Sequence, residues 1–160
     1  MTSILLNSLI IGVGATLVMD LTAWLCLRLF AIQPLNYAFV GRWLIGITHG
    51  KFRHSPIMAS PSEKHELAIG WFCHYAIGVV YAYMYLMLAN ILTLNTGNIA
   101  LLLLFTLSTL VMPFFVMQPC FGFGIAASKT PHPLQVRLKS LLAHLSFGAG
   151  LYIMILLLLG

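Results

Sequence analysis

A chain of 160 residues of which 61% are hydrophobic and 7% are charged cannot cover its surface with polar groups, since soluble domains carry about 25% charged residues. The composition excludes an ordinary soluble protein, and the length predicts one transmembrane domain over residues 1–160. The net charge of +5 comes from eight Lys and Arg against three Asp and Glu, and we interpret it through membrane topology, without a nucleic-acid partner.

Four apolar segments are each close to the roughly 20 residues that a helix needs to cross a bilayer. We expect transmembrane helices over about residues 4–30, 67–92, 99–121 and 136–159. Between the first two, FVGRWLIGITHGKFRH begins with apolar residues at the spacing of a short amphipathic helix. The predicted fold class is therefore all-α: an integral membrane four-helix bundle with an amphipathic segment in its first loop.

The basic residues predict the orientation of this bundle. All eight Lys and Arg lie at the end of the first segment, in the first and third loops, or at the start of the fourth segment, and the second loop, LNTGN, has none. The positive-inside rule makes the first and third loops cytoplasmic and places both termini on the opposite side. We therefore expect the lipid bilayer as a partner, with anionic lipid at the basic loops.

One carboxylate, Asp20, lies within the first apolar segment, where an unpaired charge is costly. At 1.5 Å per residue, Asp20, His74 and His144 lie about 10–12 Å inward from the cytoplasmic ends of their segments, and Gln118 lies somewhat shallower in the third. Small residues at four-residue spacing accompany Asp20 and both histidines, which predicts that these faces pack inward. We expect His74 and His144 to face Asp20 in the bundle interior.

Two interpretations of this polar layer (Asp20, His74, Gln118 and His144) stay open. In the first interpretation the four side chains form a structural lock, because buried polar groups need hydrogen-bond partners whether or not they take part in chemistry. Alternatively they form a proton relay or a ligand site, as intramembrane ionisable residues commonly do. A narrower hypothesis has Asp20, His74 and His144 holding a divalent metal, although the spacing of these ligand types is not diagnostic. The cofactor is otherwise unknown.

The first cytoplasmic loop carries a second group of candidate residues. One interpretation is an interfacial helix whose basic tail contacts anionic lipid. The sharper interpretation is that Arg42, Arg53 and His54 bind an anionic ligand. Arginine suits that role because its planar fork can bind a planar anion through two hydrogen bonds.

Seven stretches, taken together, carry a resemblance that covers nearly the whole chain. They are GVGATLVMD, GRW, KFRH, ELAIGWFCHYAIG, MQP, GIAASKTPHP and RLKSLLAHLSFGAGLY. The chain resembles a family of short bacterial inner-membrane proteins catalogued only as a domain of unknown function. The resemblance implies four helices in the bacterial inner membrane, so both termini would be periplasmic, and it implies no activity. The matching stretches direct attention to Asp20, Arg42, His54, Glu66, His74, Gln118, Arg137 and His144.

Three functions from different classes remain. The favoured one is a transporter or channel-like protein for a proton, metal or small solute, assembled as a homo-oligomer because one short chain has little room for a pathway. The second is an intramembrane enzyme, metal-dependent or acting on a lipid-soluble substrate, although the sequence shows no nucleophile–base motif, nucleotide loop or haem signature. The third is a non-catalytic accessory or assembly protein in which the polar layer is only a lock.

Overall fold

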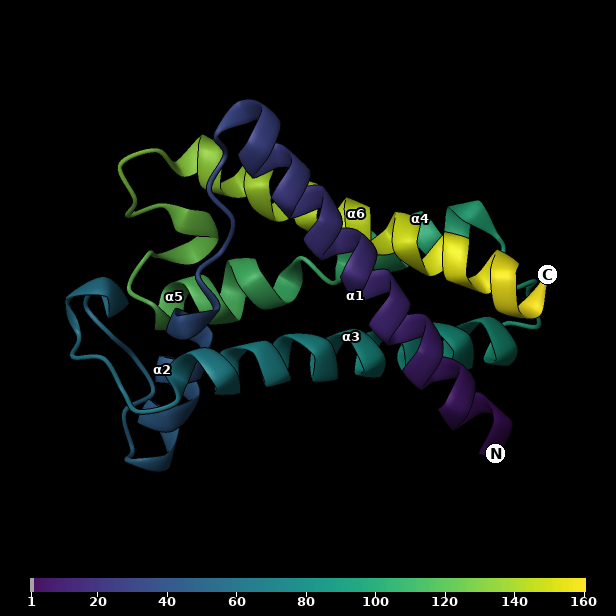
Figure 1. The fold of residues 1–160 in the computed structure, drawn as a ribbon, viewed down its shortest axis with the longest axis horizontal. Coiled ribbons are helices and arrows are strands. Elements are labelled where there is room, and N and C mark those ends of the chain that lie inside the picture. Colours follow the sequence, from purple (N-terminus) through teal and green to yellow (C-terminus); the bar gives the residue numbers. More distant parts are fainter. Residues whose placement is uncertain (1) are drawn as a thin grey trace. The chain divides into compact units, whose positions relative to one another are not determined.

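The computed structural model describes residues 2–160, and these fold into helices joined by loops (Figure 1). The helices are α1 (Thr2–Phe30), α2 (Tyr37–Thr48), η1 (Ile57–Ala59), α3 (Glu66–Ile91), α4 (Ile99–Ser108), η2 (Met112–Met117), α5 (Gln118–Cys120), η3 (Ile125–Ala127) and α6 (Pro133–Leu159). Four stretches are long and apolar enough to cross a membrane: Ser3–Phe30, Glu66–Ile91, Ile99–Cys120 and Pro133–Leu159. The predicted all-α, four-span architecture is confirmed.

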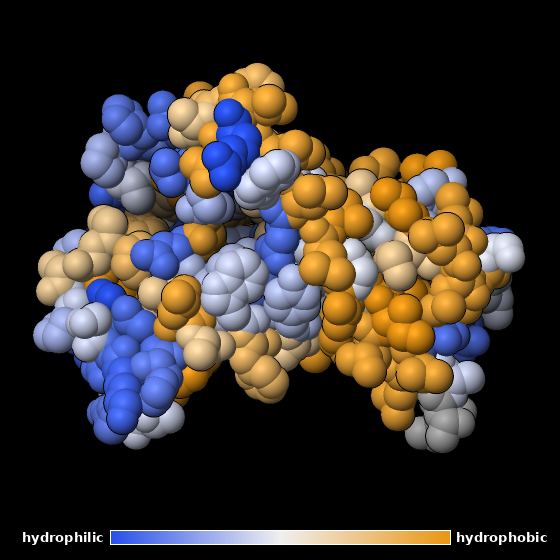
Figure 2. All heavy atoms as spheres, in the orientation of Figure 1, coloured by the Kyte–Doolittle hydropathy of each residue, from blue (hydrophilic) through white to orange (hydrophobic). Residues whose placement is uncertain are grey.

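Large apolar side chains lie on the outside of these spans. Leu5, Phe72, Leu104 and Leu157 are 58%, 77%, 68% and 76% exposed. In water this much apolar surface would be unfavourable, whereas hydrocarbon tails solvate it. Figure 2 shows hydrophobic residues over α1 and the C-terminal half of α6, and hydrophilic residues gathered over the loops that follow α2 and α5. The surface chemistry is that of a multi-pass membrane protein.

The backbone divides into two compact units, and each is described by itself. Unit 1 comprises Met1–Pro34, Tyr75–Ser108 and Leu142–Gly160, and unit 2 comprises Leu35–His74 and Thr109–Leu141. Helices α3 and α6 each contribute residues to both units. The expectation of one domain over the whole chain stays a prediction.

Close contact between helix backbones holds unit 1 together. A Cβ atom at Gly12 of α1 would lie 2.5 Å from the Val79 Cα of α3, and one at Gly150 of α6 would lie 2.7 Å from the Ala15 Cα of α1. Neither position has room for a larger residue, as expected where membrane helices pack through small residues. The side chains around these contacts form the apolar core of the unit: Ile11, Ala15, Ala82, Tyr85, Leu86, Leu102, Phe105, Phe147, Leu151 and Ile155.

Helix α2 packs against the first turns of α3 in unit 2. Its N-cap is Asn36, whose side chain accepts the Ala38 N–H at 3.0 Å. Gly41 lies directly against the Glu66 backbone, which leaves no space for a Cβ atom. The amphipathic helix is therefore present. Its buried face packs against other residues of unit 2, whereas one interpretation of the sequence placed this helix at the membrane surface.

The third span is irregular in its second half. Residues Met112–Met117 form a π-helical turn that begins beside Pro113, a residue that has no N–H to donate. The Gln118 N–H donates to the Pro113 carbonyl, five residues back instead of the α-helical four. This turn leads into α5 and the loop that packs under α2, where Val40, Ile57 and Phe121 form a small apolar core.

Candidate functional site

The carboxylate of Asp20 has a tyrosine partner inside unit 1. The Tyr75 hydroxyl of α3 donates a hydrogen bond to Asp20 Oδ2 of α1 at 2.8 Å, and both residues are half-buried. The helices are held close nearby, because Gly78 lies against the Thr16 side chain. Asp20 is thus partnered within unit 1.

His74 has a tyrosine partner within unit 2. The Tyr37 hydroxyl and His74 Nε2 are hydrogen-bonded at 3.0 Å, and the two rings stack with centroids 4.2 Å apart. The Trp71 ring packs against Tyr37 at 4.4 Å and against His74 at 5.7 Å. Since Tyr37 opens α2, this aromatic cluster ties α2 to α3.

Gln118 and His144 complete the predicted polar layer. Gln118 is buried in unit 2, where its Nε2 donates to Ser140 Oγ at 3.2 Å. Its Oε1 is buried and has no hydrogen-bond partner among residues 2–160. His144 is half-buried in the part of α6 that belongs to unit 1. The expectation that all four members face one another stays a prediction.

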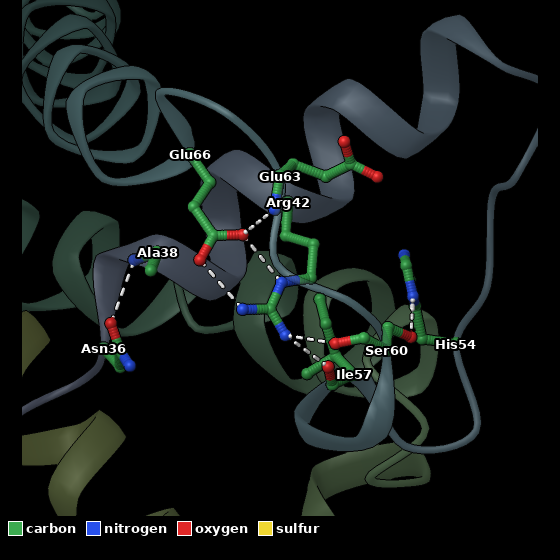
Figure 3. A network of polar contacts seen from close by, with 8 residues as sticks. All are labelled: Asn36, Ala38, Arg42, His54, Ile57, Ser60, Glu63 and Glu66. Atoms are coloured by element: carbon green, nitrogen blue, oxygen red, sulfur yellow. Dashed lines mark hydrogen bonds and ion pairs between the residues drawn. The ribbon is translucent and has the colours of Figure 1, made fainter.

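Arg42 forms a buried ion pair with Glu66 (Figure 3). Arg42 Nε and Nη2 donate to the two Glu66 carboxylate oxygens, each at 2.8 Å. Arg42 Nη1 donates to the carbonyls of Ile57 at 2.9 Å and Ser60 at 2.8 Å. The hydrogen bonds that Arg42 donates to Glu66 raise the pKa of Arg42 above its ordinary value, in spite of burial, which acts in the opposite direction. The guanidinium therefore ties three elements together: α2, the start of α3 and the loop between them.

His54 lies beside this ion pair and is only 5% exposed. Its Nδ1 is hydrogen-bonded to Ser60 Oγ at 2.7 Å, and its backbone N–H donates to the Cys120 carbonyl at 2.8 Å. Its Nε2 is buried without a hydrogen-bond partner in the described part of the chain. Burial, and then the charges of Lys51 and Arg42, lower the pKa of His54. The imidazole is therefore neutral at neutral pH.

The structure brings Arg42 and His54 of the first loop into one polar network with Glu66. Arg53 is exposed, and Arg137 is exposed with its Nε donating to the Ala126 carbonyl at 2.8 Å. The four hydrogen bonds of Arg42 all go to groups of the protein itself. That arrangement favours a structural role for Arg42 over the anion-binding role considered from the sequence.

The hypothesis of a metal bound by Asp20, His74 and His144 receives no support from the geometry. Within residues 2–160, no group of three or more His, Cys, Asp and Glu side chains is arranged to hold a metal ion. The hypothesis stays a prediction.

Sequence reasoning missed three partners that the structure shows: Tyr75 for Asp20, Tyr37 for His74 and Ser60 for His54. Each is a hydroxyl group facing an ionisable residue. One available signal was general: a buried carboxylate or imidazole needs a hydrogen-bond partner, and tyrosine and serine hydroxyls supply one. These hydroxyl groups were not predicted because the sequence-based candidates were charged, imidazole and amide side chains.

Comparison with known proteins identifies a family of unknown function. The profile of a protein family of unknown function, DUF2938, matches residues 9–158, which is nearly the whole chain. Comparison with curated proteins and comparison with solved structures each found no match.

Proposed function

Because the chain belongs to the DUF2938 family, whose function is unknown, we propose a function from its own residues: it is a small transport protein that moves a proton, or a solute coupled to a proton, across the membrane. The working residue is Asp20, with Tyr75 as its hydrogen-bond partner. The membrane is the bacterial inner membrane, with both termini periplasmic and the basic loops in contact with anionic lipid on the cytoplasmic side.

The observation that carries this proposal is the hydrogen bond from Tyr75 to Asp20 within two membrane-spanning helices. Ionisable residues are rare in such helices and commonly mark the pathways of protons and ions. A carboxyl group can bind and release a proton, and the hydrogen bond from the Tyr75 hydroxyl holds this one in place between the two helices. Reversible protonation is the property that a proton carrier needs.

One chain offers little room for a pathway, so the proposal includes assembly into a homo-oligomer. Exposed apolar residues line the outer faces of α1 and α6, among them Leu17, Leu21 and Leu156. Copies of a membrane protein can pack through such faces and close a symmetric assembly.

The test is proton flux into liposomes that contain the purified protein and a trapped pH-sensitive dye. We expect flux for the wild type, loss of flux for Asp20→Asn, and reduced flux for Tyr75→Phe. The matched control is Tyr81→Phe in the same helix, because the Tyr81 ring packs edge-on against Phe105 and Phe147. Equal flux for Asp20→Asn and the wild type, at equal folded yield, would overturn the proposal.

The two other classes give different results in the same assay. If the protein is an accessory or assembly factor, wild-type liposomes leak no faster than empty ones, and Asp20→Asn lowers only the folded yield. The enzyme class is favoured by one specific observation in unit 2, the contact between His54 and Ser60.

A further inference from the structure

The loop between α2 and α3 holds a serine and a histidine that transport leaves without a role. Ser60 Oγ lies 2.7 Å from His54 Nδ1, and Ser60 is only partly buried whereas His54 is 5% exposed. A hydroxyl within hydrogen-bond reach of a neutral imidazole is the arrangement of an activated nucleophile with its base. The two residues are six positions apart in a loop, so they do not form a recognisable sequence motif.

Backbone contacts hold the pair in place. The His54 N–H donates to the Cys120 carbonyl at 2.8 Å, and the Ile57 N–H donates to the Phe121 carbonyl at 2.9 Å. Arg42 Nη1 donates to the Ser60 carbonyl at 2.8 Å. The loop on both sides of the pair is therefore fixed, which satisfies the requirement for a preorganised nucleophile and base.

The state of His54 suits a general base. Burial and the nearby charges of Lys51 and Arg42 disfavour the imidazolium, which lowers the pKa of His54. When the Ser60 hydroxyl donates to Nδ1, the proton of the neutral ring is on Nε2, the buried atom that has no partner among the described residues. An unpaired buried N–H costs stability. A histidine in this place is therefore not explained by stability alone.

The surroundings indicate the class of substrate. Phe52 and Met58, each two positions before a member of the pair in the chain, are 62% and 61% exposed, so the segment that carries the pair presents apolar side chains at its surface. Arg42, which holds Ser60, is paired with Glu66, the first residue of the membrane-spanning helix α3. The pair thus lies at the end of a span, where the ester bonds of membrane lipids are also found.

We propose that Ser60 is a nucleophile and His54 its general base, and that the pair cleaves a carboxylic ester of a lipid at the membrane surface. Ser60 Oγ attacks the carbonyl carbon while its proton passes to His54 Nδ1. The bond from that carbon to the alcohol oxygen breaks, and His54 returns the proton to the leaving oxygen. Water then hydrolyses the acyl-serine by the same route, so one ester and one water give one acid and one alcohol.

The test uses the full chain, purified in detergent, and a fluorophosphonate probe that phosphonylates activated serines with release of fluoride. We expect the label on Ser60 by mass spectrometry, no label in Ser60→Ala, and labelling slowed roughly 100-fold in His54→Gln, the scale of general-base catalysis. Ser62→Ala, an exposed serine of the same loop, is the matched control and should label as the wild type does. A wild-type chain without label on Ser60 would overturn the proposal.

A second measurement uses the wild type alone and therefore does not depend on whether the His54→Gln variant folds. The labelling rate of the wild type should fall as the pH is lowered and His54 is protonated, with Lys51, Arg42 and the Glu66 carboxylate as the charged groups around it. A rate that does not fall at any pH down to the pH at which the protein unfolds would show that His54 is not the base. Hydrolysis of a p-nitrophenyl acyl ester by the wild type, absent in Ser60→Ala, completes the assignment to esters.

Discussion

Glu66→Leu, which breaks the ion pair with Arg42, should lower the unfolding free energy of the protein. The double variant, in which Arg42→Met is added, should be more stable than Arg42→Met alone. The two side chains are 10% and 13% exposed and share two hydrogen bonds of 2.8 Å. Breaking a buried pair by removing one partner costs about 3–5 kcal/mol. Glu66→Leu should lower the unfolding free energy by about 3 kcal/mol, at the low end of that range, because Arg42 keeps its hydrogen bonds to two carbonyls.

Arg42→Met should be more damaging, because it removes the guanidinium that donates to both Glu66 oxygens and to the carbonyls of Ile57 and Ser60. The Glu66 carboxylate then keeps the Glu63 N–H but loses its counter-charge, and the Ile57 carbonyl keeps the Ser60 N–H. An unsatisfied buried polar group costs about 1–3 kcal/mol, and a charged one costs more, so we expect about 5 kcal/mol. In the double variant the buried charge is gone, and the lost hydrogen bonds are those of the Ile57 and Ser60 carbonyls with Arg42 and that of the Glu63 N–H with Glu66. Adding Glu66→Leu to Arg42→Met should therefore restore about 2 kcal/mol.

The assay is equilibrium unfolding in mixed detergent micelles, followed by tryptophan fluorescence. Arg137→Met is the matched control, since Arg137 is exposed, and surface substitutions usually change stability by less than about 0.5 kcal/mol. A double variant less stable than Arg42→Met would show that the ion pair is not the dominant interaction of Glu66. A Glu66→Leu protein as stable as the control would contradict the whole account.

Three further results are expected. Because folding lowers the pKa of His54 from 6.5, the unfolded chain binds more protons than the folded protein below about pH 6.5. The contribution of His54 to stability is therefore complete above about pH 6.5 and declines as the pH falls. The unfolding free energy of His54→Gln should depend less on pH between about 7.5 and 5 than that of the wild type. Gly41→Ala should lower the folded yield sharply, because its Cβ would collide with the backbone of α3, whereas Gly97→Ala would meet only an asparagine side chain and should fold normally; equal yields would contradict the packing described for α2. A cysteine reporter in the LNTGN loop should react with a membrane-impermeant reagent from outside the cell, and one beside Lys51 should not; the reverse pattern would refute the proposed orientation.

The four spans could be predicted from the sequence because the membrane imposes a local rule. A helix needs about 20 apolar residues to cross the hydrocarbon layer, whatever the rest of the chain does. The second span was expected from about residue 67 and is observed over Glu66–Ile91, and the fourth was expected from about residue 136 and is observed over Pro133–Leu159. The short helix of the first loop was likewise expected from its apolar spacing, and it is observed over Tyr37–Thr48.

The pairing of polar side chains could not be predicted in this way. The sequence showed that Asp20 needs partners and pointed to His74 and His144, but the hydroxyl that donates to it belongs to Tyr75, the residue next to His74. Adjacent residues point about 100° apart around a helix axis, since a turn takes 3.6 residues. The rotation of α3 against α1, set by the close contact of Gly12 with Val79, brings the Tyr75 hydroxyl to the Asp20 carboxylate. The expectation for His74 and His144 stays a prediction.

By itself the sequence determined the membrane class, the number and length of the spans, and the one-sided distribution of positive charge, because hydropathy and charge add up along the chain. Only the tertiary structure decided that Arg42 pairs with Glu66, 24 residues away, and that the hydroxyl of Ser60 lies against His54. Both contacts depend on how α2 and its loop fold back onto the start of α3. Such contacts are set by packing in three dimensions, of which the order of residues carries no local signal.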